Sequence, residues 1–253
     1  MTPIALAAGA LVLTFGAALV GMAIRPALPD HHVGDASKDT VMRAVGLVVT
    51  LTAIVLGFMV GSAKGYYDDV RDKLNRIAAD AIVLDSNLGR FGPDSREARE
   101  LLRQSMGSAV RMLWPEHAMT MSAPAADRPL DGLERVQDVI RVLPAHDEAQ
   151  RSLRARALES SAEMAKEGWL LLELAQTRIQ APLLAILVLW LVSIFLAFGL
   201  LAPRNGTVII ALLMSALAAS GAIFLILEMY DPLGGLMQIP PATLEASLER
   251  IGR

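Results

Sequence analysis

The chain has 253 residues, of which 54% are hydrophobic, and its formal net charge is −3. It contains no cysteine, which excludes a disulfide framework, a thiolate metal site and a cysteine nucleophile. Most of its charge lies in residues 64–180, which hold 17 of the 23 Lys and Arg and 19 of the 26 Asp and Glu. The two signs are interleaved there, so the chain offers no basic surface for nucleic acid.

Four segments are long and apolar enough to cross a membrane. Each has at least twenty residues without a charged side chain, and at 1.5 Å of rise per residue each spans about 30 Å, the hydrocarbon thickness of a bilayer. Lipid offers no hydrogen bonds to the backbone, so unbroken apolar runs of this length form helices. The segments are 3–24, 44–63, 182–201 and 208–227. We predict an all-α polytopic membrane protein with four transmembrane helices.

The first of these segments is expected to remain in the mature protein. No basic residue precedes it, since Arg25 is the first charged side chain, and it exceeds the apolar core of about 7–15 residues found in signal peptides. The small pair Ala17-Ala18 leaves cleavage open as the alternative.

The second segment carries a regular stripe of side chains. Thr50, Ile54 and Phe58 follow one another at intervals of four, so successive members lie about 40° apart and share one face of a helix. The helical pattern continues without a break beyond residue 63. A membrane helix that extends into a soluble segment in this way favours an oligomeric pore over a simple anchor.

The charged segment 64–181 is predicted to be a bundle of helices. Its first stripe prolongs the second membrane helix until Gly89 and Gly92-Pro93 end it. This stripe comprises Val70, Leu74, Ile77, Ala81, Leu84 and Leu88. A second stripe leads toward the third membrane helix and comprises Leu158, Ala162, Ala165, Trp169, Leu172 and Ile179. We interpret both as core packing, and we predict a mobile loop at the Ala- and Pro-rich residues 121–129.

The sequence contains little that indicates catalysis. Gly61-Ser62-Ala63-Lys64 lacks the upstream glycine and the Ser/Thr of a phosphate-binding loop, and neither a GxSxG nor an HExxH motif is present. His31 and His32 lie close to Asp30, Asp35 and Asp39 and could bind a metal through imidazole and carboxylate. Adjacent side chains rarely bind one ion, however, and short polar loops often contain such residues. We predict no enzyme, no metal and no cofactor.

Two acidic residues stand at the end of the fourth membrane segment. Glu228 closes it, and Asp231-Pro232 follows. Ionisable groups at membrane depth are costly and often functional, whereas at the membrane surface they are ordinary, with Tyr230 as an interfacial aromatic. Gly234-Gly235 then predicts a sharp turn into the tail.

The charges also indicate an orientation. Four spans place both termini and residues 64–181 on one side, which has more basic residues near the membrane: Lys64, Arg71, Lys73, Arg76, Lys166, Arg178, Arg250 and Arg253. The other side has Arg25, Lys38, Arg43 and Arg204. Positive residues favour the cytoplasm, so we expect both termini inside, although Arg25 directly after the first span favours the opposite.

Several short motifs in the sequence resemble those of a known family. Val55-Leu56-Gly57-Phe58-Met59-Val60, running on to Tyr66-Tyr67 and Arg71, resembles the second helix of bestrophins. Glu228-Met229-Tyr230-Asp231-Pro232-Leu233-Gly234 is similar to the bestrophin segment after the last membrane helix, around an Asp/Asn-Pro-Phe-Gly motif. With Phe198-Gly199-Leu200 and Pro203-Arg204-Asn205, the pattern resembles still more closely the bacterial membrane proteins with a bestrophin-like domain.

The resemblance implies a homopentamer whose second helices line an axial pore. Thr50, Ile54 and Phe58 would then lie at neck positions. The family has larger apolar groups at the first two, which implies a wider or wetter constriction here. Gly57, Glu228, Asp231 and Pro232 are implied near the pore or at a hinge.

A departure from the family concerns calcium. Calcium-activated bestrophins continue after the proline into an acidic run that forms a calcium clasp, whereas this chain reads Leu233-Gly234-Gly235-Leu236. Without carboxylates there is no hard-oxygen cage for Ca²⁺.

The sequence therefore predicts a homo-oligomeric, passive ion channel of bestrophin type that calcium does not gate. Its partners would be further copies of itself, forming a pentamer by resemblance, together with membrane lipids and permeant ions.

The predicted domains follow the membrane segments. They are 1–63 with a short extracytoplasmic loop, 64–181 as a cytoplasmic helical domain, 182–228 as the last two membrane helices, and 229–253 as a cytoplasmic tail. The location would be the bacterial cytoplasmic (inner) membrane. The alternative is a non-conducting scaffold or sensor whose cytoplasmic helices bind a partner.

Overall fold

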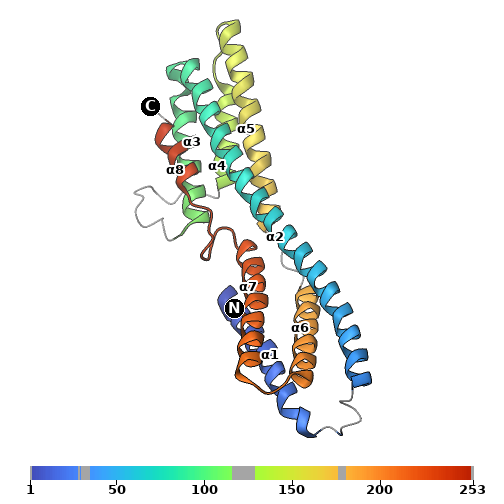
Figure 1. The fold of residues 1–253 in the computed structure, drawn as a ribbon. Coiled ribbons are helices and arrows are strands. Elements are labelled where there is room, and N and C mark those ends of the chain that lie inside the picture. Colours follow the sequence, from blue (N-terminus) through green and yellow to red (C-terminus); the bar gives the residue numbers. More distant parts are fainter. Residues whose placement is uncertain (1, 28, 30–34, 116–128, 176–180, 252–253) are drawn as a thin grey trace. The chain divides into compact units, whose positions relative to one another are not determined.

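The structure is a computed structural model that describes residues 2–27, 29, 35–115, 129–175 and 181–251. The described residues form helices and no strand, which confirms the predicted all-α class (Figure 1). The α-helices are α1 Pro3–Ile24, α2 Asp35–Phe91, α3 Arg96–Leu113, α4 Pro129–Val142, α5 Glu148–Ala175, α6 Ala181–Leu201, α7 Gly206–Met229 and α8 Ala242–Arg250. Short 3-10 turns occur at Arg25–Ala27 and Pro93–Ser95.

The chain forms two compact units that share the long helix α2. The membrane unit comprises Met1–Tyr67 and Arg178–Met237, and it contains α1, the first part of α2, α6 and α7. The polar unit comprises Asp68–Thr177 and Gln238–Arg253, and it contains the rest of α2, α3 to α5 and α8. Each unit has its own core and is described separately below.

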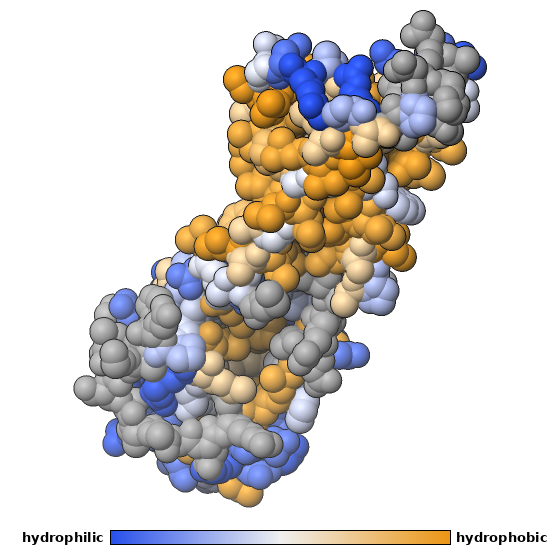
Figure 2. All heavy atoms as spheres, turned by 90° about the horizontal axis from the view of Figure 1, so that it is seen from below, coloured by the Kyte–Doolittle hydropathy of each residue, from blue (hydrophilic) through white to orange (hydrophobic). Residues whose placement is uncertain are grey.

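All four predicted membrane segments are helices of the membrane unit, and each is long and apolar enough to span a bilayer. Helix α7 extends beyond the predicted residues 208–227 at both ends. At its start Asn205 is the N-cap, and its side chain accepts the N–H of Val208 at 2.8 Å. Figure 2 shows how much apolar side chain this unit leaves on its surface, as lipid requires. The protein is an integral membrane protein.

Glycines bring the backbones of α1 and α6 together. A Cβ added to Gly199 of α6 would overlap the carbonyl oxygen of Ala18, and a Cβ added to Gly21 of α1 would overlap that of Leu196. Ala18 itself is completely buried. Membrane helices approach this closely where small residues line the contact, because association there depends on van der Waals packing.

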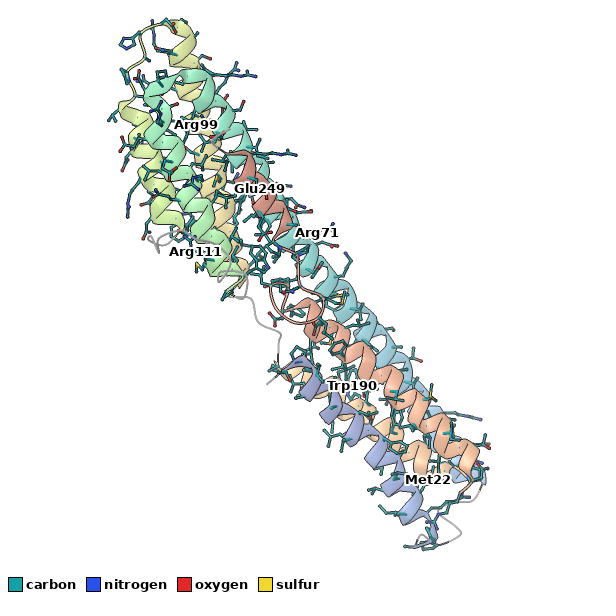
Figure 3. All side chains as sticks on the ribbon, turned by 90° about the vertical axis from the view of Figure 1, so that its left-hand side faces the viewer. Met22, Arg71, Arg99, Arg111, Trp190 and Glu249 are labelled. Carbon is teal, nitrogen blue, oxygen red and sulfur yellow. The ribbon has the colours of Figure 1, made fainter. Side chains whose placement is uncertain are left out.

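Two arginines join the ends of α1 and α6. Arg25, just after α1, donates from Nη1 to the carbonyl of Ala202 just after α6. Arg204 donates from Nε to the carbonyl of Met22 at 3.0 Å and from Nη2 to that of Ala23 at 3.3 Å (Met22 is labelled in Figure 3). Cations are favourable at helix C-termini, where carbonyls lack partners. Arg25, the residue that opposed the predicted orientation, therefore has a local structural role.

The polar unit confirms the predicted α2 stripe. Its six members, from Val70 to Leu88, are each no more than 8% exposed. Asp85 of α2 accepts two hydrogen bonds from Arg99 of α3, at 2.7 and 2.9 Å (Arg99 is labelled in Figure 3). These bonds raise the pKa of the Arg99 guanidinium above its usual value. Trp114 Nε1 donates to the carbonyl of Ile239 at 2.9 Å, which holds the tail against α3.

The second predicted stripe is wrong by about one residue. Trp169 is 58% exposed and Ala162 is also exposed. The buried residues of α5 are Ala157, Ser161, Met164, Glu167 and Leu171. A carboxylate lies in this buried set because Glu167 accepts from Lys73 at 3.1 Å and lies 3.6 Å from Arg76, both on α2. Burying a charge is tolerable only when it is paired in this way.

Several sequence-based predictions fall outside the described residues. These are Ile179 of the second stripe, the histidines His31 and His32 with Asp30, and the predicted loop at 121–129 except for Pro129, which begins α4.

Candidate functional site

The membrane part of α2 has one face that packs within the chain. Val55, Leu56, Met59, Val60 and Ala63 contact the core that α1, α6 and α7 form together. Met59 is 5% exposed and Ala63 is fully buried. This face fixes the rotation of α2 about its own axis within the membrane unit.

The opposite face of α2 contains the three predicted pore residues. Phe58 is 71% exposed and Ile54 is 64% exposed, and Thr50 is exposed as well. Thr50 Oγ1 donates to the carbonyl of Gly46 at 3.0 Å, so its hydroxyl proton stays within the helix. Because they are spaced four residues apart, Thr50, Ile54 and Phe58 lie together on α2. No other part of the described chain covers this surface.

Three glycines also lie on this face of α2. Gly57, Gly61 and Gly65 follow one another at intervals of four and lie beside the three larger residues. A Cβ built on any of them would have no heavy atom within 4 Å. The open face therefore has a row of larger side chains next to a row of glycines.

Compared with the other spans, α2 is the least covered by its own chain. Only 11% of its apolar window is buried, whereas 28% is buried in each of the spans α1, α6 and α7. A helix this exposed in a single chain must have lipid, water or another protein on its open side.

Toward its polar end, the stripe of α2 meets the segment that follows α7. Steps of four lead from Phe58 to Ser62 and then to Tyr66. The Tyr66 ring stacks on Tyr230 with centroids 5.2 Å apart and planes at 27°, and Ser62 Oγ lies 3.4 Å from the Tyr230 hydroxyl. Aromatic pairs in such offset arrangements add to the stability that burial alone provides.

The segment after α7, residues 230–237, is a turn built around Glu228, and we call it the post-α7 turn. Glu228 is 1% exposed, and its Oε1 accepts the backbone N–H of Leu236 and that of Met237, the latter at 3.1 Å. Gly235 has φ +68°, and a Cβ on it would overlap the Glu228 carboxylate. Only glycine combines this backbone conformation with such a close approach.

The other two predicted hinge residues differ in their surroundings. Asp231 is exposed and Pro232 is buried. The carboxylate of Asp231 lies against Gly234, where a Cβ would be 2.8 Å from Oδ2. The sequence therefore singles out the residues of this turn. It names Tyr66 only as part of the α2 motif and does not predict that Ser62 and Tyr66 contact this turn. Continuing the α2 stripe from Phe58 by two steps of four leads to both residues.

Within the described ranges, no group of three or more His, Asp or Glu side chains is arranged to hold a metal ion. Asp35 and Asp39, which the sequence placed near the two histidines, both lie on α2.

Comparisons with known proteins point to one family and one fold. The family described as "Bestrophin-like domain" matches residues 11–244. No curated protein sequence matches the chain significantly. Among solved structures, a bacterial bestrophin homologue from Klebsiella pneumoniae with one tryptophan changed to alanine is 15% identical, with a TM-score of 0.74 over 99% of this chain and 97% of that one.

Two further structures agree with this fold. A variant of the Klebsiella pneumoniae homologue with isoleucine changed to threonine is 16% identical and has a TM-score of 0.71 over 96% of both chains. A structure described as a membrane protein, with leucine changed to alanine, is 17% identical and has the same TM-score and coverage. The fold class and the resemblance predicted from sequence are confirmed.

Proposed function

Because the chain belongs to the family of bestrophin-like domain proteins, we propose that it is a homo-oligomeric ion channel that conducts passively through an axial pore lined by α2. Family membership favours a channel in general terms. The pore-lining residues, the number of subunits and the absence of calcium gating are proposals that rest on the geometry of this chain and on the family resemblance.

The open face of α2 is the observation that carries the proposal. Its packed face is occupied by α1, α6 and α7, while Thr50, Ile54 and Phe58 project away from them. Copies that repeat one identical contact form a closed ring when the rotation between neighbours divides the circle evenly, and we propose such a ring here. The same open face of every α2 then surrounds the axis. Five copies are favoured by the resemblance.

Phe58 would form the narrowest apolar point of this pore. It is the largest side chain of the open stripe, and a ring of phenylalanines makes a hydrophobic constriction that conducts when it wets and closes when it dries. Gly57 and Gly61 beside it add no side chain to the wall. No cofactor takes part in this mechanism, and the ions move down their electrochemical gradient.

Calcium is not needed to order the post-α7 turn. The turn follows Pro232 with two glycines, and the buried carboxylate of Glu228 already accepts backbone amides. Calcium prefers six to eight oxygen ligands, and this turn lacks the run of carboxylates that would supply them. We therefore propose a channel that calcium does not gate.

We also propose that both termini and residues 64–181 lie in the cytoplasm, with the protein in the bacterial inner membrane. The basic residues that flank 64–181 support this orientation. The hydrogen bonds of Arg25 and Arg204 to helix-end carbonyls support it too, since they account for two of the positive charges on the other side.

The proposal is tested by recording currents from the purified protein in liposomes. Discrete single-channel currents are expected, and Phe58→Ala should raise the flux while leaving assembly intact, because a side chain that is 71% exposed has little packing to lose. Leu189→Ala on α6 is the matched control, since Leu189 is 61% exposed on a different helix and should affect neither property. The proposal would be contradicted if the unaltered protein carried no current. It would also be contradicted if Phe58→Ala lost its oligomeric assembly and showed no increase in flux.

A further inference from the structure

Glu228 is a buried acid in an unfavourable place. It lies in the last turn of α7 and is 1% exposed. The C-terminal end of a helix carries a partial negative charge, so a carboxylate there destabilises the helix rather than supporting it. A buried carboxylate is also costly unless it is hydrogen-bonded. The gain that offsets both costs must come from the groups that Glu228 binds.

Those groups are the backbone amides at the far end of the post-α7 turn. The N–H groups of Leu236 and Met237 both donate to Oε1 of Glu228, the second at 3.1 Å. Gly235 packs directly on the carboxylate in a left-handed conformation, φ +68°. The Glu228 side chain therefore closes residues 228–237 into a hydrogen-bonded loop.

The closed turn is in contact with the pore helix. Tyr230, its first residue, stacks on Tyr66 and places its hydroxyl 3.4 Å from Ser62 Oγ. Ser62 is four residues after Phe58, so the two side chains are neighbours on the surface of α2. All of these residues belong to the membrane unit. A continuous path of contacts thus joins the Glu228 carboxylate to the neighbour of Phe58.

We propose that Glu228 is a positioning residue of the channel: by closing the post-α7 turn, it holds Tyr230 against Ser62 and Tyr66 and so keeps α2 in its conducting position. The inference rests on the proposed function. When the carboxylate is lost, the turn opens, α2 loses its support one helical turn from Phe58, and the apolar constriction closes.

The test compares Glu228→Leu, which has no acceptor, with Glu228→Gln, which keeps a carbonyl oxygen at the same place. Because the chain has no cysteine, Leu236→Cys supplies one site for a nitroxide spin label, and Leu236 is 76% exposed. In this background Glu228→Leu should mobilise the label and lower the liposome flux about fivefold or more, the lower end of ordinary coupling between sites. Glu228→Gln should retain an immobile label and most of the flux.

Two further variants keep the proposal falsifiable if Glu228→Leu does not assemble. Gly235→Ala forces a Cβ into the carboxylate and should mobilise the label and lower the flux together. Tyr230→Phe removes only the hydroxyl at Ser62, so the flux should fall while the label stays immobile.

The outcomes separate this inference from the proposed function. An unaltered protein that carries no current overturns the channel, and the inference with it. An unaltered protein that conducts, together with a Glu228→Leu or Gly235→Ala variant whose mobile label leaves the flux unchanged or higher, overturns the role of Glu228 alone.

Discussion

The membrane unit contains glycines in two settings that differ in what lies next to them. At the crossing of α1 and α6, Gly21 and Gly199 are in contact with backbone, and no side chain would fit at either position. On the open face of α2, Gly57, Gly61 and Gly65 have no heavy atom within 4 Å of a built Cβ. The same residue type therefore holds the chain together in one place and leaves a surface open in the other.

This difference separates stability from function. Close backbone packing between α1 and α6 makes the helical scaffold, and disturbing it should unfold the protein. The open α2 face contributes little to the folded chain, so changes there should alter conduction and leave the fold intact. The predictions below test that division, beginning with the largest expected effect.

Gly199→Ala should destabilise the membrane unit severely. The added Cβ overlaps the carbonyl oxygen of Ala18, a backbone atom that cannot rotate away, so we expect a loss of about 3 kcal/mol or more, at or beyond the upper end of overpacking effects. Thermal unfolding in detergent measures it. Gly16→Ala is the control on α1, where a Cβ meets nothing within 4 Å. Equal unfolding temperatures for the two variants would contradict the tight crossing.

Gly61→Leu should lower conduction without affecting stability. The new side chain points along the same open face as Ile54 and Phe58, so it narrows the proposed lumen, and we expect the flux to fall about tenfold, equivalent to about 1.4 kcal/mol of added barrier. Liposome flux measures this effect. Gly9→Leu is the control, since Gly9 is exposed on α1 and also has nothing within 4 Å. If both variants conduct like the unaltered protein, Gly61 does not face a lumen.

Calcium should leave the ion flux through the protein unchanged. The post-α7 turn has glycines where an acidic run would be needed, and the Glu228 carboxylate already accepts two amides. The liposome flux is compared in chelator and in micromolar Ca²⁺. A severalfold change in either direction would show that another part of the chain binds the ion.

The parts of the fold that the sequence predicted well are those with one strong and local signal. Four unbroken apolar runs gave the membrane helices, and the stripe from Val70 to Leu88 was predicted correctly because polar residues surround it. On α5 the prediction failed because Ala and Leu occur on neighbouring faces. Its buried Glu167 also depends on Lys73, which is 94 residues away in the sequence.

The candidate site shows a different limit. A membrane helix such as α2 is apolar on every side, so periodicity shows that Thr50, Ile54 and Phe58 share a face but not which face packs. That assignment needs the partners of Met59 and Ala63, which lie on other helices. In the same way, the glycine positions of the α1–α6 crossing are visible in the sequence, while their pairing is a tertiary property.

Thiol labelling of the open face tests the central claim most directly. Ile54→Cys in this cysteine-free chain places one thiol where the pore wall is proposed. If α2 lines a water-filled pore, a charged, water-soluble thiol reagent should react there and block the current, while Leu189→Cys on α6 should leave the current unchanged. A conducting Ile54→Cys protein that the reagent neither labels nor blocks would show that this face of α2 meets lipid or protein instead.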